Sequence, residues 1–257
     1  MISPLYGQLS PLRIPTKVRQ ISTDADVAAY ILAVESADGQ QLEDGVITAV
    51  ESFVLGCKSD GIWSAIKASC ILAGARTLSG ALKPLIGTAP TSSNFVSADY
   101  NRKIGLKGNG STKYLNSNRN NNSDPQNNKH LAVFMSETGT SALIGGGSAT
   151  QILEVAPLVY PRINSAGSVT AAFATGLIAA SRSVSTSINY RINSAQNSMA
   201  ATSGPPASAA VYVFARGAAT SSTSARLSFY SIGENIDLAA LDTRVSTLMT
   251  SLAAAIP

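Results

Sequence analysis

The sequence is poor in charged and aromatic side chains, which are only 13% and 6% of its 257 residues. Its 19 Lys and Arg exceed its 15 Asp and Glu by a net charge of only +4. Cations this few and scattered do not form the basic stripe of a nucleic-acid-binding protein. A single His and two Cys exclude most zinc sites. The spacing of Cys57 and Cys70 fits no metal or redox motif, so we expect buried, reduced thiols.

Long hydrophobic runs are also missing. No stretch approaches the roughly 18 apolar residues that a membrane-spanning helix needs, so we expect no membrane insertion. The first residues, MISPLYGQLSPLRIPTKVRQ, have no basic start followed by an apolar core, so we expect no signal peptide and synthesis in the cytoplasm.

Residues 1–22 instead resemble an extended arm. Pro4, Pro11 and Pro15 fix the backbone φ angle and remove amide donors, which disfavours helices and central strands. The apolar side chains between these prolines are expected to be buried against another protein surface. The pattern therefore predicts an arm that docks on a partner protein or a neighbouring subunit through Leu5, Tyr6, Leu9, Leu12 and Ile14.

Residues 23–93 predict a helical attachment segment. The first helix is capped by Thr23 or Asp24 and closed by Gly39, and the second places Val46, Val50, Phe53, Val54 and Cys57 on one face. A third helix is predicted from about Asp60, with Ile62, Trp63, Ile66 and Cys70 as its apolar positions.

Residues 94–257 predict a β-sandwich followed by a helix. Short apolar runs alternate with Gly, Asn, Ser and Pro, which is typical of antiparallel sandwiches and barrels. The expected strands are Lys113–Leu115, His130–Ser136, Ala142–Ile144, Ile152–Val155, Ser187–Ile192, Val211–Ala215 and Arg226–Ile232. After a cap at Asn235, the apolar residues Leu238, Leu241, Val245, Leu248 and Leu252 predict an amphipathic helix on the sheet or, alternatively, a short oligomer seam.

Four of these segments, in order, resemble the strands of laminin-G/concanavalin A-like lectin domains. They are Lys103–Asn118, His130–Ser136, Ser187–Asn193 and Phe229–Val245. The resemblance implies a mainly β fold with helices: a small N-terminal helical segment, an antiparallel jelly-roll sandwich and a C-terminal helix. Lectins of this shape often bind calcium, but Asp124 stands alone in its loop, so we expect no metal and no cofactor.

The whole chain, including YILAVESADGQQLEDGV and DGIWSAIKASCILAGARTLSGAL, also resembles structural proteins of tailed bacteriophages. This resemblance implies a virion component, a tail fibre or receptor-binding protein, held by other virion proteins through the arm and facing host surface glycans. A homo-oligomer is expected, and a trimer is the natural guess for a fibre. The alternatives are a capsid decoration or collar protein and, third, a carbohydrate-active depolymerase.

The loop Asn116–Lys129 is the most unusual local feature. Asn side chains both donate and accept hydrogen bonds, as sugar hydroxyls do, and Arg119 adds a charged donor. The pattern predicts carbohydrate binding through Asn118, Arg119, Asn120, Asn122 and Asp124. The alternative is a polar loop that binds nothing, because Asn also favours turns.

Catalytic patterns are weak. Gly108–Ser111 and Gly145–Ser148 lack the Lys-Ser/Thr of a phosphate-binding loop and are interpreted as turn glycines. His130 has no nucleophile elbow and is interpreted as a turn-edge residue. Glu137, Glu154 and Glu234 are the only candidates for paired catalytic carboxylates, and we predict that the protein is not an enzyme.

Overall fold

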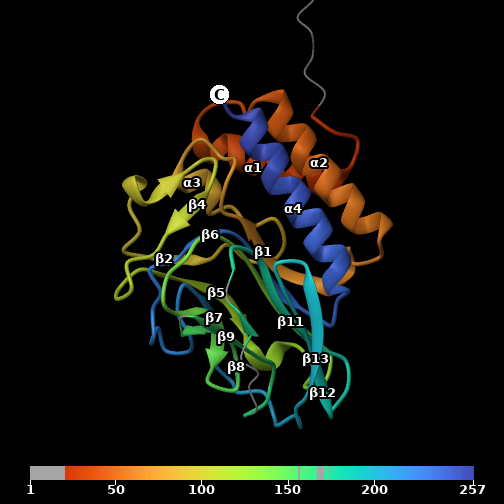
Figure 1. The fold of residues 1–257 in the computed structure, drawn as a ribbon. Helices are drawn as coiled ribbons and strands as arrows, with labels where there is room; N and C mark the ends of the chain where they lie inside the picture. The colour runs from red at the N-terminus through yellow and green to blue at the C-terminus, as the bar shows by residue number, and fades with distance from the viewer. Residues whose placement is uncertain (1–20, 156, 167–170, 173) are drawn as a thin grey trace, which may run out of the picture.

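The computed structural model describes residues 21–155, 157–166, 171–172 and 174–257 (Figure 1). The predicted docking residues of the arm therefore lie outside the described part of the chain. Within that part, no helix is long and apolar enough to cross a bilayer. No three of the described His, Cys, Asp and Glu side chains are grouped as metal ligands.

Four α-helices are present in the described chain. Their bounds are α1 Ala25–Asp38, α2 Asp44–Ser59, α3 Leu78–Ala81 and α4 Leu238–Ala255. The predicted start and end of α1 are confirmed, since the Asp24 side chain accepts from two backbone amides and Gly39 has a left-handed φ of 68°. The N-cap of α4 is Asp237, so the predicted cap at Asn235 is wrong by two residues.

The third predicted helix is wrong. After a single 3-10 turn at Trp63–Ala65, the chain forms a strand, β1 (Ile66–Ile71), which pairs with β15 (Arg226–Gly233). Five of the six β1 residues are buried. A strand buried on both faces produces a continuous apolar run that periodicity cannot distinguish from a helix.

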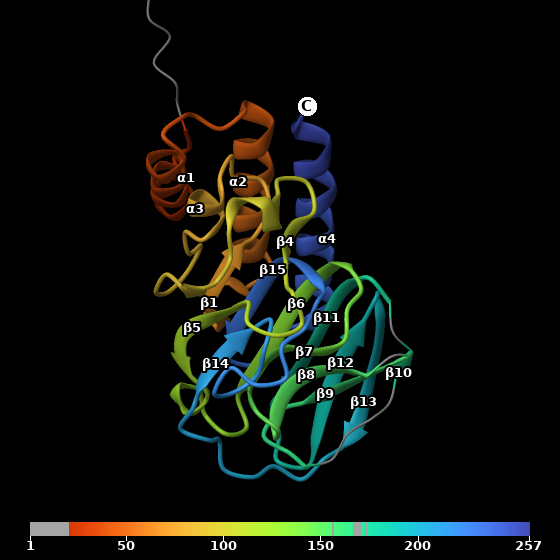
Figure 2. The same ribbon diagram turned by 90° about the vertical axis from the view of Figure 1, so that its left-hand side faces the viewer.

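Two antiparallel sheets stack to form a sandwich, which confirms the predicted fold class (Figure 2). Sheet A has the order β13-β12-β11-β6-β15-β4-β3, with β1 also paired to β15. Its remaining strands are β3 Tyr100–Asn101, β4 Gly105–Lys107, β6 Lys129–Glu137, β11 Gly176–Arg182, β12 Ser187–Ile192 and β13 Ala195–Ala200.

Sheet B has the order β10-β9-β8-β7-β14-β5-β2. Its strands are β2 Thr91–Ser93, β5 Tyr114–Asn120, β7 Ser141–Gly147, β8 Thr150–Val155, β9 Leu158–Arg162, β10 Ala171–Ala172 and β14 Ala210–Val213. Gly145 and Gly146 therefore lie within β7, so their interpretation as turn residues is wrong. A Cβ on Gly146 would approach the Cβ of Asn121 to 2.8 Å, which explains the need for glycine there.

The two faces of sheet A support two hydrophobic cores. On β6, Leu131 and Val133 point into the core between the sheets, whereas Ala132 and Phe134 point outward to the helices. α1, α2 and α4 cover that outer face (Figures 1 and 2). All five predicted apolar positions of α4 are buried there, so the helix packs on its own sheet. Both cysteines are buried free thiols, as expected.

Candidate functional site

The outer face of sheet A changes character where the helical cover ends. Under the helices it presents apolar side chains such as Leu177, Ala179 and Phe229. On the β12–β13 hairpin, the same face presents polar ones. Asn189 lies opposite Ser198, and Arg191 lies opposite Gln196. The other face of β12 stays apolar and buried, because strand residues alternate between the faces.

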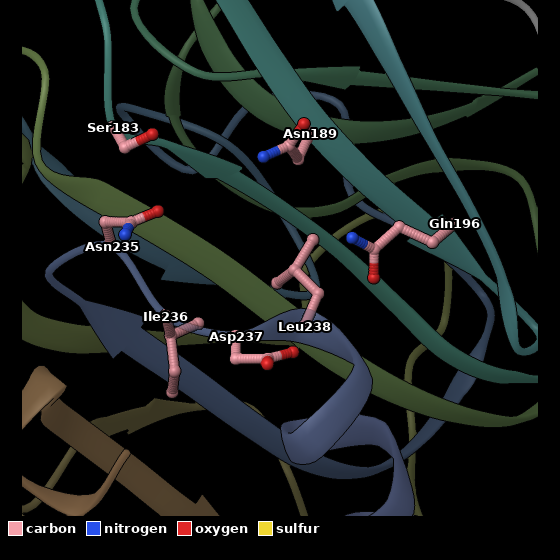
Figure 3. Close-up of a pocket in the computed structure, with 7 residues that line it drawn as sticks. All are labelled: Ser183, Asn189, Gln196, Asn235, Ile236, Asp237 and Leu238. Carbon is pink, nitrogen blue, oxygen red and sulfur yellow. The ribbon is translucent and has the colours of Figure 1, made fainter. Parts of the chain in front are cut away.

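A polar cleft of about 300 Å³ lies at this transition. Figure 3 shows the side chains of Ser183, Asn189 and Gln196 on one side and the turn between β15 and α4 on the other. The full lining is Ser183, Asn189, Gln196, Asn235, Ile236, Asp237 and Leu238. Its polar groups are one hydroxyl, three carboxamides and one carboxylate.

The turn between β15 and α4 is held in place by three hydrogen bonds to two side chains, Ser181 and Asn128. The Ser181 hydroxyl donates to Asn235 Oδ1 at 2.7 Å and accepts from the Ile236 amide at 3.2 Å. The Asn235 amide donates to Asn128 Oδ1 at 2.8 Å. The cleft wall is therefore fixed before any ligand arrives, which lowers the entropy cost of binding.

His130 supports the same turn from beneath. It is fully buried in β6, with Nδ1 against the backbone oxygen of Glu234 and Nε2 2.8 Å from the Ser231 hydroxyl. Burial, chiefly, lowers the pKa of this imidazole to about 4. The residue is a neutral structural group near neutral pH, and it lies at the start of β6, where the strand follows the loop.

The cleft offers free hydrogen-bonding groups. In the part of the chain that the structure describes, neither the Asn189 nor the Gln196 side-chain amide has an intramolecular partner, and both residues are exposed. Asp237 caps α4 through Oδ1, which accepts from two backbone amides, and among the described residues its second oxygen accepts no hydrogen bond. These groups are ready to exchange water for a polar ligand.

The charged residues beside the cleft, Arg191 and Asp242, are paired with each other. Arg191 Nε donates to Asp242 Oδ2 at 2.7 Å, and the Ser194 hydroxyl donates to the same oxygen at 3.1 Å. Asp242 is buried on α4. This ion pair ties the β12–β13 hairpin to α4 and neutralises the guanidinium, leaving Asp237 as the one ionisable side chain in the lining.

Most of the predicted binding residues in the loop Asn116–Lys129 make hydrogen bonds within the protein. Arg119 makes two hydrogen bonds to the carboxylate of Asp124, which is 1% exposed. Asn118 adopts a left-handed φ of 56° and donates to the Ala89 carbonyl at 2.8 Å. Three of the five predicted binding residues therefore have intramolecular partners.

Asn120 and Asn122 differ from the other three, because both are exposed and no hydrogen bond of either side chain is present among the described residues. Carbohydrate binding by this loop stays a prediction that rests on these two. Its most direct link to the cleft is Asn128, which anchors the Asn235 amide.

The sequence predicts a strand at Asn189 but does not predict the cleft. The alternation of Asn189 and Arg191 with buried neighbours shows which face is polar, but it does not show that the helical layer stops there. Gln196 and Asp237 join the site only through sheet pairing and the turn before α4, neither of which a single sequence specifies.

The candidate catalytic carboxylates do not converge. Glu137 pairs with Lys107 and Arg226 at one end of β15, whereas Glu234 follows the other end, about 25 Å away along the strand. Glycosidase carboxylates stand about 5–10 Å apart. Glu154 is 1% exposed within the sandwich, and burial raises the pKa of this carboxyl to about 7.

Comparisons with known proteins show distant structural similarity without a family match. No protein-family model matches the chain, and no curated protein matches it. Among solved structures, the chain is similar to domain 4 of AbnA, a GH43 extracellular arabinanase from Geobacillus stearothermophilus, solved in complex with arabinotriose. The identity is 13% and the TM-score 0.38, over 65% of this chain and 82% of that one. A match this distant does not identify a ligand.

Proposed function

We propose that the protein is a glycan-binding structural component of a tailed-phage particle, a tail fibre or receptor-binding protein, and that the polar cleft is its sugar site. The observation that carries the proposal is the pair of side-chain amides of Asn189 and Gln196, which have no partner among the described residues and face the fixed turn at Asn235 and Asp237. The sequence resemblance to phage structural proteins supplies the setting.

The cleft chemistry matches sugar hydroxyls. Each hydroxyl donates and accepts, and a carboxamide offers both roles within one planar group. Asp237 adds an acceptor, and its charge disfavours acidic sugars by like-charge repulsion. Neutral glycans are therefore the expected ligands.

Binding at one such open cleft is expected to be weak, with Kd of about 1 mM or somewhat tighter. Presenting several copies on one particle raises the overall affinity through effective concentration. A homo-oligomer, with a trimer as the starting guess, fits this need. The arm and the helical layer then serve attachment, leaving the β12–β13 end of the molecule outward.

A glycan array with the full chain tests the sugar site. We expect binding of neutral glycans by the wild type and at least a tenfold loss in the double variant Asn189→Ala/Gln196→Ala. The matched control is Asn197→Ala, on the same strand but the opposite face. Equal binding by the double variant and the wild type would exclude this cleft, and loss in the control alone would move the site to the other face of the hairpin.

Mass spectrometry of purified virions tests the setting. A copy number far below that of the major capsid protein is expected for a tail component. A number approaching that of the capsid protein would favour the decoration alternative, and absence from the particle would contradict both.

A further inference from the structure

A buried and unbalanced charge cluster lies at one end of the sandwich, on the inner face of sheet A. Lys129 and Arg182 face each other in the register of β6 and β11, and both are 0% exposed. The carboxylate described beside them is Asp124, which is already engaged by Arg119 and lies 3.8 Å from Lys129 Nζ. A charged, buried Lys129 beside a second buried cation costs free energy.

Lys129 is aimed at a side-chain amide. Its Nζ lies 2.9 Å from Asn121 Oδ1 and also donates to the backbone carbonyl of Asn121. On the far side of the same carboxamide, Asn121 Nδ2 lies 3.3 Å from Thr150 Oγ1 and from Asn164 Oδ1. Asn121 is 1% exposed. The amine and the amide carbon are thus held together away from water.

We propose that Lys129 and Asn121 react to form an intramolecular isopeptide bond. The ammonium gives one proton to the Asp124 carboxylate, and the free amine attacks Asn121 Cγ. The new Nζ–Cγ bond forms as the Cγ–Nδ2 bond breaks. The leaving nitrogen takes a second proton from the amine and departs as ammonia, which the Asp124 proton converts to ammonium. No oxidant, reductant or other reactant is consumed.

The surroundings favour each part of this step. Burial lowers the pKa of Lys129 to about 8, so an appreciable fraction of the side chain is the nucleophilic free amine. Fixed proximity replaces a bimolecular encounter. The product amide is neutral, so the reaction removes one of the buried cations instead of leaving it uncompensated.

The cross-link would close the Asn-rich loop covalently. Asn128, next to Lys129, accepts from the Asn235 amide and so steadies the wall of the polar cleft. A covalent closure between Asn121 and Lys129 would hold that anchor while the particle is exposed to heat or denaturants. The proposal itself does not depend on what the cleft binds.

Intact-mass and peptide mass spectrometry of the folded full chain test the bond. We expect a mass lower than the sequence mass by about 17 Da, one ammonia, with trypsin failing to cut after Lys129 and fragment ions joining Lys129 to Asn121. Lys129→Met preserves a long buried side chain and is expected to restore the sequence mass.

One other reaction has the same mass change. Succinimide formation, most readily at Asn109-Gly110, also releases ammonia, but hydroxylamine cleaves a succinimide and leaves an isopeptide bond intact. A wild-type chain that keeps the full sequence mass after prolonged incubation at about pH 9, where the amine is free, overturns the proposal. So does a loss of ammonia that persists in Lys129→Met or that maps away from Asn121.

Discussion

The outer face of sheet A has one end that helices cover and one end that is exposed to solvent. Under α2 and α4 it is apolar, and Phe229 meets Phe53 with ring centroids 5.7 Å apart. On the β12–β13 hairpin the same face displays Asn189 and Gln196 to solvent. Since strand geometry is the same at both ends, the difference lies in what covers the sheet. Burial by the helices explains the apolar side chains of the first end, whereas the polar side chains of the second end can bind a ligand or water.

The boundary between the two ends is built from small buried polar groups. Ser181, Ser231 and His130 lie on the outer face where the apolar cover stops, and all three make hydrogen bonds with each other or with the turn before α4. Buried polar groups are tolerated when they are paired in this way. The account therefore predicts separate consequences for substitutions on either side of the boundary.

The largest effect is expected at the covered end. Phe229→Ala removes a fully buried ring from between sheet and helices and is expected to lower the free energy of unfolding by about 3–5 kcal/mol. Denaturant-induced unfolding followed by circular dichroism measures it. A loss below about 1 kcal/mol would show that the helical layer contributes little to stability.

The boundary should respond to acid through His130. Its pKa is about 4 in the folded chain and about 6.5 when unfolded, so burying the neutral ring contributes stability above pH 6.5. That stability is lost as the pH falls toward 4, by about 3 kcal/mol in all. Between pH 6.5 and 4, the free energy of unfolding should therefore fall more steeply with decreasing pH in the wild type than in His130→Gln. The same pH dependence in both proteins would contradict the role given to His130.

A smaller effect is expected where the hairpin is tied to α4. Asp242→Ala leaves Arg191 without its buried partner, and we expect a loss of about 1.5–3 kcal/mol. The matched control is Asp60→Ala, which breaks the more exposed pair of Asp60 with Arg244 and should cost less than about 1 kcal/mol. Equal losses in denaturant unfolding would mean that burial does not distinguish the two pairs.

The smallest effect on stability is expected at the open end. Asn189→Ala/Gln196→Ala removes two exposed amides that have no partner in the described part of the chain, so the free energy of unfolding should change by no more than about 0.5 kcal/mol. Thermal and denaturant unfolding check this. A loss of more than about 2 kcal/mol would show that these amides are structural, and any loss of glycan binding would then be indirect.

The sequence predicts elements better than it predicts their partners. The caps of α1, the apolar stripe of α4 and seven of the fifteen described strands follow from local patterns, because capping and periodicity are properties of a short segment. The strand at Ile66–Ile71 was predicted as a helix because both of its faces are buried. Which strands pair is a long-range property, and alternation alone does not encode it.

The candidate site shows the same limit more strongly. The Asn-rich loop is unusual in composition, yet Asp124 and Asn121 are buried, and the Asn118 side chain donates to the distant Ala89 carbonyl. The cleft is assembled from Ser183, the hairpin and the turn before α4, which are distant in sequence. Its residues are ordinary in composition, and only their meeting at the end of the helical cover makes them a candidate.

Hydrogen–deuterium exchange with and without the glycan that binds most strongly on the array tests the central claim most directly. The account predicts slowed exchange in β12, β13 and the turn at Asn235–Asp237, and unchanged exchange in α2 and the helix-covered part of α4. Protection confined to Asn116–Lys129 or to the helices, or an array on which no glycan binds, would contradict it.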